Sequence, residues 1–122
     1  MKYIISFLFL FGCLSTVSAQ VAKDTRLMGD TTLQDVQTMD IYSDSLSNSM
    51  IVFAPSGFNK QRIGAPTREQ IMVLQGEAQF IFEEKTIAAK TGTYLVIPAN
   101  TRHRVVVAGE TPIKMLVIQD AL

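Results

Sequence analysis

From residue 49 to the end of the chain, apolar and polar residues alternate in short runs separated by glycine, proline and charged residues. Alternation with a period of two, bounded by such turn formers, is typical of β-strands. No ten-residue segment outside the first nineteen residues shows the 3.6-residue period of an amphipathic helix. Strands are expected at 36–42, 50–53, 58–63, 70–75, 78–83, 86–89 and 113–119, with two more within 92–107 on either side of a turn at Pro98. Many short strands at even spacing predict an all-β fold, an antiparallel sandwich, jelly roll or barrel.

The stretch 92–107 carries the clearest two-strand signal and the only histidine of the sequence. Pro98 ends the first strand because it fixes its own φ, and Asn100 is the non-glycine residue that best tolerates positive φ. His103 then falls early on the second strand, with Val105 and Val107 on its side by the period of two. We therefore expect His103 to face the interior.

The first nineteen residues have the pattern of a secretory signal peptide. Lys2 gives a positive start, residues 4–14 an apolar core, and residues 17–19 a small-residue cleavage site before Gln20. This apolar run is shorter than the roughly twenty residues of a spanning helix, so no membrane span is expected after its removal. A retained anchor is the alternative, and Cys13 is a weak lipidation candidate. The pattern predicts an exported protein, periplasmic or extracellular.

The remainder is long enough for one domain. Residues 20–33 are polar without sustained periodicity, which predicts a flexible N-terminal segment, and residues 34–122 form the predicted barrel domain. The whole chain has 11 basic and 11 acidic residues, so removing Lys2 with the signal peptide leaves ten against eleven, a net charge of −1. No basic patch stands out, which argues against nucleic acid as a partner.

Two motifs in this strand pattern resemble those of the cupin family. The second cupin motif is a glycine, five residues, Pro-x-Gly, two residues, His, three residues and Asn, and Gly92, Pro98 and His103 match it at the correct spacing. Asn100 replaces the inner glycine and Val107 the final asparagine. The resemblance covers roughly 36–119 and implies an antiparallel double-stranded β-helix, the jelly-roll or cupin barrel.

The first cupin motif is His-x-His, three or four residues, Glu, six residues and Gly. Glu69 and Gly76 match it, whereas both histidines are absent. The four-residue spacing places Arg62 and Gly64 at their positions; the three-residue spacing places Ile63 and Ala65 there. Family members hold a divalent metal through these histidines, the glutamate and the second-motif histidine.

Only Glu69 and His103 of that ligand set carry over, so the resemblance implies a degenerate metal site. A catalytic zinc site needs three protein ligands, and a non-haem iron site needs two histidines and a carboxylate. Arg62 would add a permanent positive charge where the cation binds. We therefore expect no cofactor; the alternative is a divalent metal held by Glu69 and His103.

Arg62, Glu69 and His103 are the candidate ligand-binding residues. Arg62 and Glu69 could form a charge pair, and His103 could hydrogen-bond the carboxylate or a ligand. The alternative is that all three residues fill the barrel interior and bind no ligand. Polar groups among apolar ones suit a small-molecule pocket, and the expected apolar lining is Ile71, Val73, Phe80 and Val105.

Three functions remain open at this stage. The first is a small-molecule-binding module for an anionic or polar ligand. The second is a metal-dependent cupin enzyme, an isomerase or dioxygenase. The third is a scaffold or interaction domain of the cell envelope, a homodimer through an edge strand near 36–42.

Overall fold

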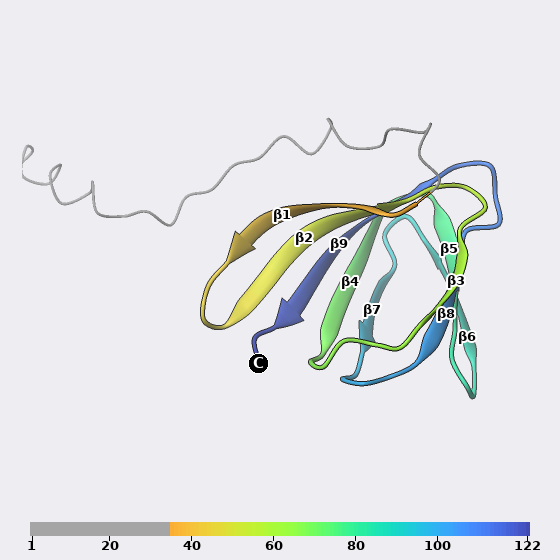
Figure 1. Ribbon diagram of the computed structural model, residues 1–122. Helices are drawn as coiled ribbons and strands as arrows, with labels where there is room; N and C mark the ends of the chain where they lie inside the picture. Colours follow the sequence, from red (N-terminus) through yellow and green to blue (C-terminus); the bar gives the residue numbers. More distant parts are fainter. Residues whose placement is uncertain (1–34) are drawn as a thin grey trace, which may run out of the picture.

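The computed structural model describes residues 35–122, and every regular element within that range is a β-strand (Figure 1). The predicted signal peptide and the whole of the predicted flexible segment, 20–33, lie outside these residues. All nine expected strands are present, with ends that differ from the prediction by up to three residues. They are β1 (Gln37–Ser43), β2 (Ser47–Ala54), β3 (Asn59–Arg62), β4 (Glu69–Gln75), β5 (Glu77–Ile81), β6 (Thr86–Lys90), β7 (Tyr94–Ile97), β8 (His103–Val106) and β9 (Ile113–Asp120).

The strands form two antiparallel sheets that enclose the core between them. One has five strands in the order β1-β2-β9-β4-β7, and the other has four in the order β3-β8-β5-β6. After β2 the chain passes from sheet to sheet at almost every connection, as Figure 1 shows. This is the jelly-roll arrangement, and the predicted all-β fold is confirmed. Within residues 35–122 no helix is long and apolar enough to cross a membrane.

Alternation along each strand sends every second side chain into the space between the sheets. The burial of β4, β5 and β8 follows this period of two. The largest fully buried side chains of the described residues are Phe80, Ile97, Ile113, Val73 and Val107. Each contributes about 1.5–3 kcal/mol by leaving water, so the sandwich core is the main source of stability.

The turn before β8 is fixed by its neighbour, the loop between β3 and β4. Asn100 has φ 55°, as its position in the motif predicted, and its N–H donates to the carbonyl of Ala65 at 2.7 Å. Gly64 has φ 94°, and a Cβ on it would lie 2.7 Å from both the nitrogen and the oxygen of Thr101. Only glycine allows this approach. The two loops therefore hold Thr101 in place, two residues before His103.

Candidate functional site

His103 is the first residue of β8 and is 3% exposed, so the predicted inward orientation is confirmed. Its Nδ1 lies 2.9 Å from the carbonyl oxygen of Thr101. Since a carbonyl only accepts, this contact assigns the proton to Nδ1 and leaves Nε2 of the neutral ring as an acceptor. The ring also stacks on Phe82, with centroids 5.4 Å apart, and on Phe80 at 6.3 Å. The imidazole is held by one hydrogen bond and two aromatic contacts.

Glu69 is the first residue of β4 and enters the interior from the opposite sheet, with 8% exposure. It lies directly across the ladder from Gln119 of β9, whose Nε2 donates to Glu69 Oε2 at 2.7 Å. Among the described residues no side chain or backbone group donates to Oε1. The carboxylate therefore keeps one oxygen that can accept a further hydrogen bond.

The charge pair that Arg62 and Glu69 could form is not present among the described residues. Among residues 35–122 the ion pairs join Lys60 to Asp35 and Arg68 to Asp120, and none joins Arg62 to Glu69. The reason lies in the sheets: Arg62 ends β3, an edge strand whose residues are all exposed, whereas Gln119 is Glu69's neighbour in its own sheet.

Arg62 nevertheless belongs to the same site. It is the ladder partner of His103, so the two side chains lie on the same face of the four-stranded sheet. Because Arg62 is exposed while His103 is buried, the guanidinium stands at the rim and the imidazole inside. The structure thus brings the three candidate residues together from three strands and both sheets.

These residues line one cavity of about 110 Å³ between the sheets. Of the expected apolar lining, Ile71, Phe80 and Val105 contact it and Val73 does not. The full lining comprises Val36, Thr38, Met50, Val52, Ala54, Phe58, Arg62, Glu69, Ile71, Phe80, His103, Val105, Met115, Val117 and Gln119. The volume lies below the roughly 300–1,000 Å³ typical of sites for drug-sized ligands.

Gln119 is the site residue that sequence reasoning missed. The signal for it was available, because Ile113, Met115 and Val117 point inward by the period of two, and Gln119 is the next residue in that series. A polar residue at an inward position of a central strand needs a partner. The partner here is Glu69.

The donor set of this cavity does not fit the metal that the resemblance implies. Glu69 and His103 supply two ligands, one fewer than a catalytic zinc or non-haem iron site needs. The positions of the two missing histidines are occupied by the cationic Arg62 and by Gly64. At Gly64 the backbone of Thr101 leaves no room for a side chain. Within the part of the chain that the structure describes, no three His, Cys, Asp or Glu residues are grouped for a metal ion.

Comparisons with solved structures show a widespread fold. A cupin superfamily protein from Desulfitobacterium hafniense DCB-2 superposes with a TM-score of 0.64 at 20% identity, covering 85% of this chain and 100% of the other. The protein TT1209 from Thermus thermophilus gives a TM-score of 0.70 at 15% identity, with 82% and 96% covered. The DMSP lyase DddQ from Ruegeria pomeroyi DSS-3 gives 0.64 at 18% identity, with 84% and 56% covered.

Identities this low establish the fold and leave the activity open. No curated protein matches the sequence significantly. The profile of the Cupin_2 family, described as a cupin domain, matches residues 49–119, which span β2 to β9 and include Arg62, Glu69, His103 and Gln119. This match covers more than half of the chain, so the chain belongs to the cupin family.

Proposed function

We propose that this cupin domain binds a small polar molecule in the cavity between its sheets, through Glu69 and His103, with Arg62 at the rim. The observation that carries the proposal is burial. Glu69 and His103 are the buried polar residues of the described chain, and both line the same cavity from opposite sheets. Burying a carboxylate and an imidazole is unfavourable compared with apolar residues of similar size, so a barrel that served only as scaffold would gain stability without them.

The free atoms of the two residues define the chemistry of the ligand. Gln119 bonds to Oε2 of Glu69, and the carbonyl of Thr101 bonds to Nδ1 of His103. The remaining atoms, Oε1 of Glu69 and Nε2 of His103, are both hydrogen-bond acceptors. The ligand should therefore donate hydrogen bonds, through hydroxyl or amine groups. Arg62 at the rim suits an anionic group at the other end of the molecule. A small hydroxy acid or amino acid has both features.

The volume restricts the size of the buried part. A dry cavity of about 150 Å³ holds benzene, so about 110 Å³ accommodates roughly six non-hydrogen atoms or fewer. A larger molecule would extend past Arg62 into solvent. The apolar lining, which includes Phe80 and Met115, favours a short carbon skeleton between the polar ends.

Titration of the purified protein with small hydroxy acids, amino acids and amino alcohols, followed by thermal shift and calorimetry, tests the proposal. A binder should lose at least about tenfold in affinity in Glu69→Gln and in His103→Gln, because each change alters one free acceptor. Glu77→Gln is the matched control, since Glu77 is exposed on β5 and lies outside this cavity. Binding that survives both site substitutions, or no binding by any compound, would count against the proposal.

A further inference from the structure

The cavity that holds Glu69 and His103 opens to solvent between an edge strand of each sheet. Of the described residues that line it, Thr38 and Arg62 are the exposed ones. Thr38 lies on β1 and Arg62 on β3, each at the edge of its own sheet. In Figure 1 the start of β1 lies close to the chain that leads into β3. A contact that joins these two strands therefore stands at the mouth of the cavity.

An ion pair joins the two edges. Oδ1 of Asp35, the residue before Val36 of the cavity lining, lies 3.5 Å from Nζ of Lys60 on β3. The N–H of Val36, and after it the Lys60 ammonium, lower the pKa of Asp35, so its carboxylate is ionised near neutral pH. The side chains of Lys60 and Asp35 are 60% and 75% exposed, so the pair adds little to the stability of the fold.

Lys60 extends over the mouth from the same side as Arg62. Lys60 is the ladder partner of the buried Val105 and Arg62 that of the buried His103, so both cations lie on the inner face of β3. Residues two positions apart on a strand are separated by about 6.8 Å. Nζ of Lys60 lies 5.7 Å from the ring centroid of Phe58, which lines the cavity. The attraction between ammonium and ring holds the charge at the mouth.

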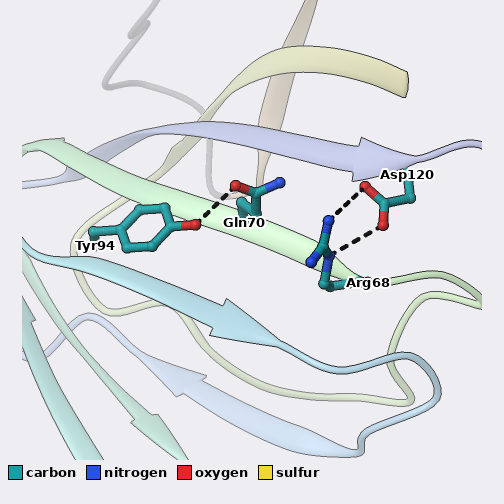
Figure 2. Close-up of polar contacts among 4 residues, drawn as sticks. All are labelled: Arg68, Gln70, Tyr94 and Asp120. Atoms are coloured by element: carbon teal, nitrogen blue, oxygen red, sulfur yellow. Dashed lines mark hydrogen bonds and ion pairs between the residues drawn. The ribbon is translucent and has the colours of Figure 1, made fainter. Parts of the chain in front are cut away.

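The other ion pair of residues 35–122 has a different form. Figure 2 shows Arg68 bonded to both carboxylate oxygens of Asp120 at 3.0 and 3.4 Å, and Tyr94 Oη donating to Gln70 Oε1 at 2.7 Å. None of these four residues lines the cavity. Two parallel bonds fix the arginine and the aspartate in one geometry, whereas the single contact at the mouth lets the ammonium exchange partners.

We propose that Lys60 and Arg62 together bind the anionic group of the ligand, and that Asp35 occupies the position of that group in the empty protein. The inference rests on the proposed function, because it assigns the residues that hold the outer end of the ligand. Among the described residues no carboxylate pairs with Arg62, so the two cations share the single carboxylate of Asp35. A carboxylate or phosphate group with oxygens about 2.8 Å from each nitrogen spans their separation. Asp35 then turns into solvent, to which it is already 75% exposed.

Asp35 is therefore a competitor of the ligand within the same chain. Such a competitor reduces the apparent affinity by the fraction of molecules in which the ammonium is free. For an exposed ion pair the reduction is about twofold to fivefold. Removing Asp35 should strengthen the binding of an anion, whereas removing Lys60 should weaken it. An uncharged ligand should be indifferent to both changes.

Titration of the purified protein with glycerate, followed through the NMR signals of β3, tests the proposal, with glyceramide as the uncharged counterpart. Asp35→Asn should lower the Kd of glycerate about twofold to fivefold, and Lys60→Gln should raise it about threefold or more. In the Lys60→Gln background Asp35→Asn should have no further effect, because the competition needs the ammonium. Glu110→Gln is the matched control for the loss of one negative charge, since Glu110 is exposed and lies outside this cavity.

Two results of the glycerate titration would overturn the proposal. One is an Asp35→Asn variant that binds no more tightly than Glu110→Gln, and the other is a gain from Asp35→Asn that persists without Lys60. Inorganic phosphate separates this proposal from the proposed function, because phosphate needs only the two cations and not the interior. Phosphate should shift the signals of β3 and bind more tightly to Asp35→Asn even if no compound enters the cavity. If phosphate leaves β3 unchanged while glycerate binds through Glu69 and His103, the anion site is wrong and the proposed function stands.

Discussion

Replacing Gln119 by leucine tests whether the interior polar pair stabilises the fold or only serves the ligand. Gln119 donates the one protein hydrogen bond that the buried Glu69 carboxylate receives among the described residues. A hydrogen bond to a charged group contributes about 1.5–3 kcal/mol, and its loss leaves the carboxylate unsatisfied. Because Glu69 is only 8% exposed, water compensates little, and we expect Gln119→Leu to lower the free energy of unfolding by about 2 kcal/mol.

The double variant Glu69→Leu with Gln119→Leu should behave differently. Replacing both partners by apolar groups removes the unsatisfied charge and adds buried apolar surface, so most of the lost stability should return. Urea unfolding measures both effects. With a slope of about 1 kcal/mol per molar urea for a domain of this size, the single variant should shift the midpoint by about 2 M. Ligand binding should be lost in the double variant.

Two results would refute this reasoning. An unchanged midpoint for Gln119→Leu would mean that the hydrogen bond at 2.7 Å contributes nothing to stability. The second result is a double variant that loses as much unfolding free energy as the two single variants lose together. It would show that the polar pair is structural, and the argument that the pair is retained for a ligand would fail.

Three further predictions concern the loops and the N-terminus. Gly64→Ala should destabilise the fold by about 2 kcal/mol or more, measured by urea unfolding, because φ 94° and the backbone of Thr101 exclude a side chain. The N–H groups of Leu46 and Ser47 lower the pKa of Asp44, so the ionised carboxylate stabilises the fold. The wild-type protein should therefore be more stable than Asp44→Asn, and this difference in stability should reach its full size above about pH 4. It should disappear as the pH falls through the lowered pKa of Asp44, which acid unfolding would detect. Finally, the exported protein should begin at Gln20, and mass spectrometry that finds intact residues 1–19 would contradict the signal-peptide prediction.

The strands could be predicted from sequence because local alternation and turn formers determine them. Gly92, Pro98 and Asn100 mark a turn whose geometry needs only local residues, and Asn100 indeed adopts positive φ. Strand ends were less certain: β2 begins at Ser47, three residues earlier than expected. Ser47 to Ser49 are polar, and it is their pairing with β9 that extends the strand. Such tertiary pairing leaves no local pattern.

The site was predicted in part for a similar reason. Glu69 and His103 occur at motif positions, so the family pattern led to both. The partner of Glu69 depends on which strand lies beside β4, and that neighbour is β9, with Gln119 separated from Glu69 by 50 positions along the chain. From the sequence, only the oppositely charged Arg62 came into question as a partner of Glu69.

At the ends where Glu69 and Gln119 lie, the strands β4 and β9 depart from the usual distribution of polarity. Facing the cavity, they carry Glu69 and Gln119; facing outward, they carry Met72, Leu116 and Ile118. The polar interior lowers the stability of an isolated chain, and the apolar exterior adds none until something covers it.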